Sequence, residues 1–395
     1  MRRGYNGGMK RGIATFTLDE GKCPPWLFRR MVALGRDIVR ILVAEYGPDE
    51  FIKRMADPVC FQSLGTVLAF DWNASGLTTI LTAALKEAIR HEEWELGVFI
   101  CGGKGKTSRQ TPDEILRWGE KIGMSEKKTN ALVYNSKMSA KVDSALVQDG
   151  FQIYHHSFMF SRNGAWTVVQ QGMNTERQTA RRYHWFSENV HDLVSEPHSG
   201  ISSKFVGKNV LNMVAKESGG SREMSVDLVG GGYTSLMKDI TILRRHFSRY
   251  SNMVSLQSGK EQLTLLDLDR GEFKEHPMVH ENFVMNKYLD KVLREVAYVN
   301  PENYEKMVAL KGVGPKTVRA LALVGEVIYG AKPSYEDPAR YSFAHGGKDG
   351  TPFPVDLNTY DQTIAILKRA VAKTRWSSDE KRKAVNKLEA PSGKN

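Results

Sequence analysis

Residues 151–173 read FQIYHHSFMFSRNGAWTVVQQGM, and this stretch decides the fold class because its periodicity differs from that of its surroundings. Aromatic and β-branched residues dominate both halves, and Asn163-Gly164 between them is a pair typical of a tight hairpin turn. The sequence therefore predicts two antiparallel strands in the middle of the chain.

Apolar residues recur at helical spacing on both sides of this hairpin, with proline and glycine near the expected ends. A short apolar run over 98–101 is interpreted as a buried strand, and the serine- and glycine-rich residues 195–232 as loops. Helices are predicted over 24–47, 77–94, 125–148, 175–194, 235–250 and most of 282–389. A further helix is predicted to begin at residue 111.

These patterns predict an α+β protein with a mixed N-terminal part and a helical C-terminal part. The expected division is an α/β domain over 1–148, a hairpin and basic-helix segment over 149–232, and a helical domain over 233–395.

The composition favours an anionic partner. The 395 residues include 56 Lys plus Arg against 45 Asp plus Glu, which gives a net charge of +11 and a pI near 9.3. Such a balance is typical of proteins that bind nucleic acid. Cys23, Cys60 and Cys101 form no CxxC pair, so zinc and iron–sulfur frameworks are not predicted. No apolar run has the length of a membrane span, and we expect a cytoplasmic protein without a membrane partner.

Residues 310–330 read LKGVGPKTVRALALVGEVIYG. Within this stretch, residues 311–315 join two predicted helices, 301–310 and 317–329. Glycines at 312 and 314 leave backbone amides open to a ligand, next to a helix N-terminus that favours negative charge. Such a connection grips a phosphodiester backbone without reading bases. A plain helical hairpin with a glycine turn is the alternative. The predicted nucleic-acid contacts are Lys311, Gly312, Val313, Gly314 and Thr317.

Lys311 to Leu321 closely resembles the helix-hairpin-helix motif of DNA repair proteins. Residues 353–356, FPVD, are similar to the segment that carries the catalytic aspartate of the helix-hairpin-helix DNA glycosylases. The resemblance implies that Asp356 stabilises charge on the sugar and that Lys316 is the nucleophile of a bifunctional enzyme. Lys316 and Asp356 lie 40 positions apart (356 − 316), roughly twice the usual separation. Alternatively, Lys316 only contacts a phosphate and Asp356 is the N-cap of the helix that follows it.

Two further basic segments are predicted to contact nucleic acid. The stretch GGKGKT at 102–107 lacks the first glycine of a P-loop, where Ile100 stands, and its helix starts too late. A basic loop that touches phosphates is the better interpretation. The second segment is one face of the helix predicted over 175–194. The candidate contacts in these segments are Lys104, Lys106, Arg109, Arg177, Arg181 and Arg182.

Histidines in the middle of the chain suggest a metal-dependent nuclease as an alternative. His155 or His156 would bind a divalent ion together with acids such as Asp143 or Asp149. Neighbouring residues in a strand face opposite sides, however, so the two histidines cannot easily share one ion. Polar core histidines are the other interpretation.

Seven segments together resemble a prokaryotic family labelled domain of unknown function 763, and the resemblance spans nearly the whole chain. It implies a hairpin-containing C-terminal part and supplies no activity. The segments are DPVCFQSLG, DWNASGLTTILTAALKE, GGKGKTSRQTP, YHHSFMF, WTVVQQGMN, ARRYHW and FAHGGKDGTPFPVD.

We expect a DNA-binding protein of the nucleoid, a DNA repair enzyme of the glycosylase or abasic-site lyase type. Its partner would be duplex DNA, intact or damaged, with RNA as an alternative. No cofactor is predicted, apart from a divalent metal under the nuclease alternative. A non-catalytic nucleic-acid-binding protein is the remaining alternative.

Overall fold

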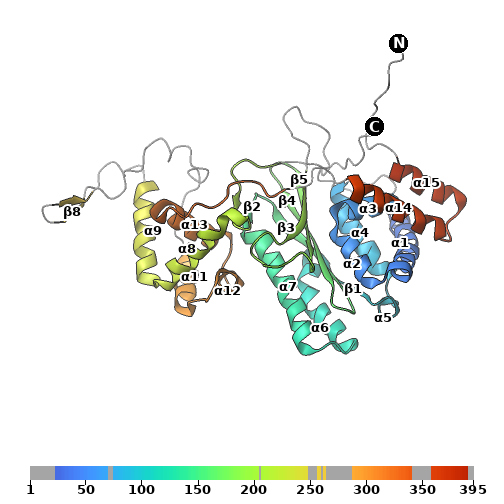
Figure 1. Cartoon of the computed structure of the whole chain (residues 1–395), viewed down its shortest axis with the longest axis horizontal. Helices are drawn as coiled ribbons and strands as arrows, with labels where there is room; N and C mark the ends of the chain where they lie inside the picture. The colour runs from blue at the N-terminus through green and yellow to red at the C-terminus, as the bar shows by residue number, and fades with distance from the viewer. Residues whose placement is uncertain are drawn as a thin grey trace, which may run out of the picture.

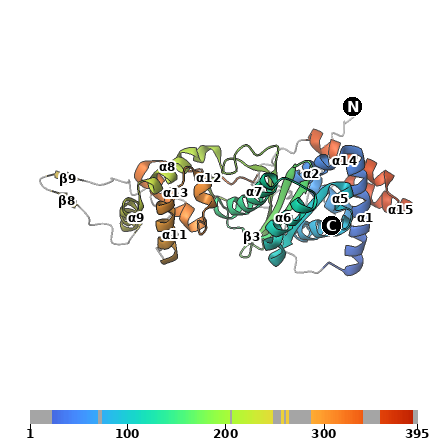
Figure 2. The ribbon, with the colours of Figure 1, turned by 90° about the horizontal axis from the view of Figure 1, so that it is seen from below.

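The computed structural model describes residues 23–69, 74–203, 206–247, 256–258, 261–263, 287–339 and 357–389. It is elongated, with helices at both ends and a sheet between them (Figures 1 and 2). The sheet and the helices lie together as an α+β fold, as the sequence predicts.

Four helices form the N-terminal end. They are α1 Pro25–Tyr46, α2 Pro48–Ala56, α3 Pro58–Ala69 and α4 Ala74–Ala88, followed by the single turn α5 Glu93–Leu96. The first three begin with proline, which is pre-organised for a first helical position. The helix predicted over 24–47 is confirmed. The helix predicted over 77–94 ends earlier, at Ala88, and His91 beyond it has a positive φ of 73°.

Five antiparallel strands form the central sheet in the order β1-β3-β4-β5-β6. The predicted hairpin is confirmed, and Gly164 in its turn has a φ of 104°. The strands are β1 Val98–Lys104, β3 Gln152–Ser161, β4 Trp166–Asn174, β5 Thr179–Phe186 and β6 His198–Ser203.

The helix predicted over 175–194 is wrong, because β5 occupies its centre. Tyr183 belongs to the hydrophobic core on one face of the sheet and Phe186 to the core on the other, which is the alternation of a strand. The loop prediction for 195–232 is also wrong in two places, where β6 and α8 Gly219–Gly230 form. Pairing and packing with distant segments override the local propensity of these residues.

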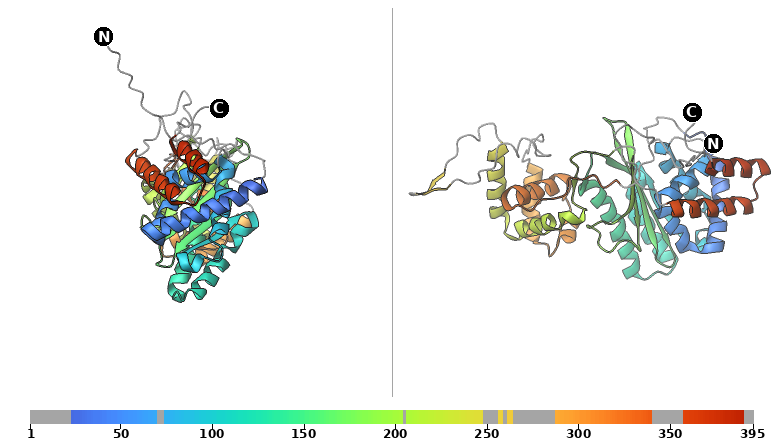
Figure 3. Two further views of the ribbon diagram at one scale, coloured as in Figure 1. Left: turned by 90° about the vertical axis from the view of Figure 1, so that its right-hand side faces the viewer. Right: turned by 45° about the horizontal axis from the view of Figure 1, so that its top comes forward.

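Each face of the sheet carries its own core. The first face packs against α2, α3 and α4, and its core is completed by α1 and by the last two helices, α14 Leu357–Lys373 and α15 Ser378–Glu389, which pack on these helices. Figure 3 shows these last helices beside the first ones. Helices α14 and α15 belong to the third predicted segment, 233–395, but they pack with the N-terminal helices of the first, 1–148. The predicted division into 1–148, 149–232 and 233–395 therefore differs from the packing at this point.

The second face packs against α6 Thr111–Lys121 and α7 Glu126–Ala145, both close to their predicted positions. Beyond α7 lies a helical group that ends the molecule on that side (Figure 1). This group consists of α8, α9 Tyr233–Phe247, α11 Lys287–Val299, α12 Tyr304–Ala309 and α13 Pro315–Tyr329. Smaller pieces are η1 Gly105–Gln110, η2 Lys216–Ser218 and the pairs β2 Val147–Gln148 with β7 Leu211–Asn212 and β8 Leu256–Ser258 with β9 Glu261–Leu263.

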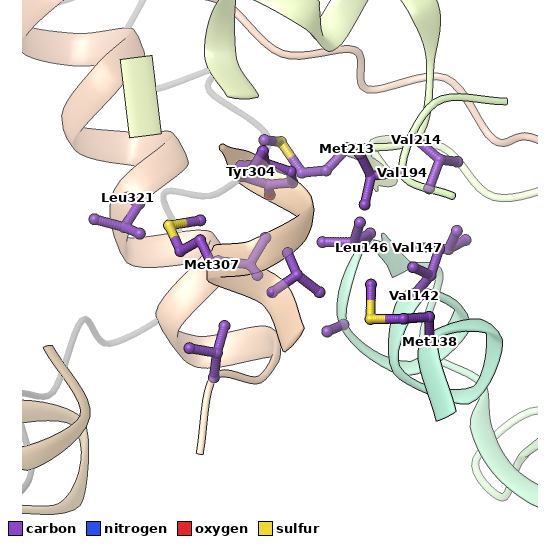
Figure 4. Packing of buried hydrophobic residues seen from close by; sticks show 14 of the residues in the cluster. Met138, Val142, Leu146, Val147, Val194, Met213, Val214, Tyr304, Met307 and Leu321 are labelled. Atoms are coloured by element: carbon purple, nitrogen blue, oxygen red, sulfur yellow. The ribbon is translucent and has the colours of Figure 1, made fainter. Parts of the chain in front are cut away.

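The helical group is joined to the sheet layer through buried apolar contacts. Figure 4 shows Tyr304 and Met307 of α12 approaching Leu146 and Met213 at the end of α7 and after β7. The hairpin of α12 and α13 is thereby held against α7. Within the described residues, no helix is both long and apolar enough to cross a membrane.

Candidate nucleic-acid interface

The two helices predicted around the glycine connection are present as α12 and α13, and residues 310–314 connect them. The Asn303 side chain caps α12 by accepting a hydrogen bond from the amide of Lys306 at 2.9 Å. Gly314 precedes α13 in an extended conformation, with φ −151° and ψ −169°, and Pro315 follows as the first helical residue. The first amides of α13 have no preceding helical turn to accept their hydrogen bonds and can donate to an anion.

The structure requires glycine at position 312 but has room for a side chain at position 314. Gly312 has a φ of 90°, and a Cβ there would lie 2.9 Å from Cγ2 of Val292. The fold itself therefore requires Gly312. A Cβ on Gly314 would meet only the carbonyl oxygen of Gly312, at 3.9 Å, so the fold would accept alanine. The absence of a side chain at 314 leaves its amide accessible.

The residues predicted to bind nucleic acid differ in exposure. Lys311 and Lys316 are exposed beside the connection. Val313 and Thr317 are only 4% and 3% exposed, so they can hardly offer side chains to a ligand, and the amide of Val313 already donates to the carbonyl of Leu310 at 3.4 Å. The predicted contact of Thr317 with nucleic acid would therefore use its backbone.

Polar contacts tie the hairpin to the end of α7. The Lys141 ammonium group donates to the carbonyl of Leu310, and burial lowers the pKa of Lys141 below its usual range. The Gln148 side chain donates to the carbonyl of Pro315 at 2.9 Å and accepts from Nε of Arg319 at 2.7 Å. The connection is thus held on both sides of its glycines.

The turn between β4 and β5 follows Asn174 and is hydrogen-bonded to the loop at Gly150. Arg177 is exposed there, and its amide donates to Oδ1 of Asn174 at 2.9 Å. Nδ2 of Asn174 donates to the carbonyl of Gly150 at 3.2 Å, two residues beyond the Gln148 that contacts Pro315. The predicted contact Arg177 therefore lies exposed in a turn and not on a helix face.

Arg181 does not contact nucleic acid as predicted, because its side chain is fully buried on β5. It donates to Asp149 at 2.7 Å and to Asp337 at 2.7 Å, and both carboxylates are buried as well. Burial alone would lower the pKa of Arg181, but these two carboxylates raise it and keep the guanidinium charged. Arg181 anchors the loop that ends at Gly150 and the segment 331–339 to the sheet.

Arg182 is also fully buried, on the opposite face of β5, and the prediction of a nucleic-acid contact is wrong for it too. Its Nε donates to Nε2 of His184 at 2.8 Å, and its terminal nitrogens reach Gln62 at 3.1 Å and Thr78 at 3.3 Å. Burial lowers its pKa to about 9. Arg182 joins β5 to α3 and α4 and is not accessible from outside.

The glycine-rich loop stays a candidate for phosphate contact. Lys104, Lys106 and Arg109 are all exposed at the end of β1 and along η1. Thr107 lies in the short 3-10 helix η1, and the α-helix α6 begins only at Thr111, so the α-helix that a P-loop requires directly after its Gly-Lys-Thr is not formed there.

The two neighbouring histidines point to opposite faces of β3. Nε2 of His155 lies 3.1 Å from the hydroxyl of Thr82 on α4, whereas Nε2 of His156 lies 2.9 Å from the hydroxyl of Ser136 on α7. Burial lowers the pKa of both imidazoles, to about 3 for His155. No group of three or more His, Cys, Asp or Glu residues within the described ranges is arranged to hold a metal ion.

The acids considered for a metal centre have other partners or positions. Asp143 is fully buried and accepts from Trp185 at 3.1 Å and from His198 at 2.6 Å. Asp192 lies with His191 beside a cavity between α7, α8 and α12. Neither carboxylate lies in a cluster with His155. The His198–Asp143 contact was not predicted, because β6 was expected to be a loop.

Of the two predicted catalytic residues, Lys316 lies within the described residues. Lys316 is exposed at the second position of α13, which is the position of a backbone contact. Asp356 lies outside the described residues, one residue before α14 begins at Leu357. The catalytic roles of Lys316 and Asp356 stay predictions.

Comparison with known families places the chain in one of them. The model of the family described as "Protein of unknown function (DUF763)" matches residues 12–355, so the chain belongs to this family. No curated protein matches the chain, and no solved structure matches it either.

Proposed function

We propose that the protein binds duplex DNA through the connection between α12 and α13 and acts in DNA repair, as a glycosylase or abasic-site lyase. The observation that carries the proposal is the conformation of Gly314, extended before α13 with open space in place of a side chain. A phosphate could approach the amides there, between the exposed Lys311 and Lys316. Such a protein would work at the nucleoid.

Exchanging Gly314 for alanine tests the binding mode directly. The fold has room for the added methyl group, but the methyl would keep a phosphate away from the amides. Hydrogen bonds to charged groups contribute roughly 1.5–3 kcal/mol, so Gly314→Ala should weaken duplex binding by about 10- to 100-fold. Fluorescence anisotropy with a labelled duplex measures this change. Gly220→Ala, at an exposed glycine of α8 with equal room, is the matched control and should bind normally. Equal affinity of both variants would contradict the proposal.

Electrostatic attraction should contribute to the same binding. We expect affinity to fall steeply with salt, and each phosphate contact that is removed should reduce the slope by about 1. Lys311→Ala is therefore expected to flatten the salt dependence by about that amount. Affinity that does not change with salt would remove the electrostatic part of the proposal.

Borohydride trapping on DNA with an abasic site tests the catalytic role. If Lys316 attacks the sugar, the wild-type protein should form a covalent adduct and Lys316→Ala should not, whereas Lys311→Ala should still do so. The exposure of Lys316 favours a second candidate, a DNA-binding protein without this chemistry. An adduct that persists in Lys316→Ala would show that another amine reacts, and no adduct in any protein would favour the second candidate.

A further inference from the structure

A cavity of about 700 Å³ lies beside β1, the edge strand of the sheet, away from the hairpin. Helix α4 and helix α6 form its walls, and Ser157 of β3 contributes to its floor. Its volume lies in the range of roughly 300–1,000 Å³ that is typical of pockets for small ligands.

Ser157 has a hydroxyl group without a partner on this floor. The residue is 1% exposed, and its Oγ forms no hydrogen bond with any described group. Its partner in the β1 ladder is Gly102, which has no side chain that could cover it. A buried polar group without a hydrogen bond is costly, and natural proteins rarely leave one unless a ligand or water satisfies it. The hydroxyl of Thr82 nearby is different, because it reaches the carbonyl of Thr78 at 2.9 Å.

Lys86 brings a positive charge to the cavity. Its Nζ donates to Oε2 of Glu114 at 2.7 Å and to the carbonyl of Gly102 at 3.1 Å. The same Oε2 accepts from the Gly102 amide at 2.7 Å, which fixes the Glu114 carboxylate against the backbone. An ammonium group has three protons, so these two contacts leave one for a ligand.

The rim of the cavity adds further positive charge. Lys104, Arg117 and Lys121 line it from exposed positions. The lining of the cavity contains five cationic side chains and three carboxylates. One of these carboxylates, Glu87, forms an ion pair with Arg90 at 3.1 Å. The cavity is thus suited to an anion.

We propose that this cavity binds the phosphate monoester of a nucleotide, with the phosphate between the Ser157 hydroxyl and the Lys86 ammonium group. Both groups can donate hydrogen bonds to phosphate oxygens, and the rim cations offset the remaining charge. The rest of the cavity has room for the sugar and base against Phe28, Ile100 and Trp118. A free mononucleotide and the 5′-phosphate at a DNA end present the same chemistry. The site does not depend on duplex binding at the hairpin.

Thermal unfolding and calorimetry of the full chain test the site with adenosine 5′-monophosphate, adenosine and inorganic phosphate. We expect the monophosphate to raise the melting temperature and adenosine to have no effect, since a ligand that binds only the folded state stabilises it. Anisotropy with duplexes that carry either a 5′-phosphate or a 5′-hydroxyl tests the DNA end. Tighter binding of the phosphorylated duplex would assign the site to DNA ends, and a response to the monophosphate would assign it to free nucleotides.

Ser157→Ala separates the proposal from a general effect of charge. The variant should be as stable as the wild type without ligand, because the lost hydroxyl has no partner, and its response to phosphate should weaken by about tenfold or more. Ser202→Ala is the matched control, since Ser202 is a buried strand serine whose Oγ also lacks a partner among the described residues but does not line this cavity. It should respond like the wild type.

The inference is overturned if neither probe gives a response that depends on Ser157. Gly314→Ala distinguishes this outcome from failure of the proposed function, because that variant should lose duplex affinity and keep the response to the monophosphate. Ser157→Ala should show the reverse pattern.

Discussion

At the scale of single residues, burial decides what the basic side chains and histidines of β3 and β5 can do. Arg181 and Arg182 are adjacent in the chain and both fully buried, yet their guanidinium groups form hydrogen bonds on opposite faces of the sheet. His155 and His156 are divided in the same way between α4 and α7. A sequence shows that these residues can be charged, but only their surroundings determine whether they are charged and accessible.

His155 should make stability depend on pH. Its pKa is about 6.5 in an unfolded chain and about 3 in the fold, because burial disfavours the charged ring. Below pH 6.5 His155 binds a proton in the unfolded state but not in the folded state. The free energy of unfolding therefore decreases as the pH falls from 6.5 toward 3. His155→Gln should reduce the loss of stability between pH 7 and pH 5 by about 2 kcal/mol.

Urea denaturation at both pH values measures this difference. His191→Gln, which removes an imidazole from an exposed position, serves as the control. Equal pH dependence of His155→Gln and the wild type would show that the fold does not lower the pKa of His155.

At the scale of elements, β5 and the α12–α13 hairpin illustrate two different sources of structure. The hairpin connection depends on nearby residues, mainly on glycine at 312 and proline at 315, and the sequence predicts it correctly. Residues 179–186 carry a pattern compatible with a helix, but they pair with β4 and β6. The strand is stabilised by partners that no local pattern reveals.

Replacing Arg181 by methionine should be strongly destabilising if β5 is the buried strand described above. The exchange leaves the carboxylates of Asp149 and Asp337 buried without their cation, at a cost of roughly 3–5 kcal/mol. Arg177→Met, at an exposed position of the same segment, should change stability by less than about 0.5 kcal/mol. Chemical denaturation distinguishes the two.

A rescue variant sharpens this test. Adding Asp149→Asn and Asp337→Asn to Arg181→Met removes the buried charges and should recover most of the lost stability. If Arg181→Met is as stable as Arg177→Met, Arg181 is not buried between these carboxylates.

At the scale of the whole molecule, the end of the chain returns to its beginning. Helices α14 and α15 pack against α1 and α3, and Leu367, Val371 and Trp376 enter the core of the N-terminal helices. Arg30 pairs with Glu380, and Lys373 with Glu45, across the same contact. The two ends of the sequence therefore stabilise one layer of the molecule.

Leu367→Ala should consequently weaken the N-terminal helices. Its side chain is 1% exposed, and truncating a buried leucine costs roughly 2–5 kcal/mol. Native-state hydrogen exchange should show faster exchange in α1 and α3 and unchanged exchange in α13. Arg369→Ala, on the exposed side of the same helix, is the control. Unchanged protection of α1 in Leu367→Ala would contradict a shared core.

The sequence by itself determined the α+β class, the β3–β4 hairpin and the connection at 310–314, because turn residues and apolar periodicity act over a few neighbouring positions. It also indicated the candidate phosphate contacts Lys311 and Lys316. The tertiary structure alone decided that residues 179–186 form a strand, that Arg181 and Arg182 are buried, and that Ser157 lies in a cavity. These features depend on partners far along the chain, such as Asp337, 156 positions from Arg181, and Gln62, 120 positions from Arg182. Contacts over such distances form only when the layers pack, so no local pattern can predict them.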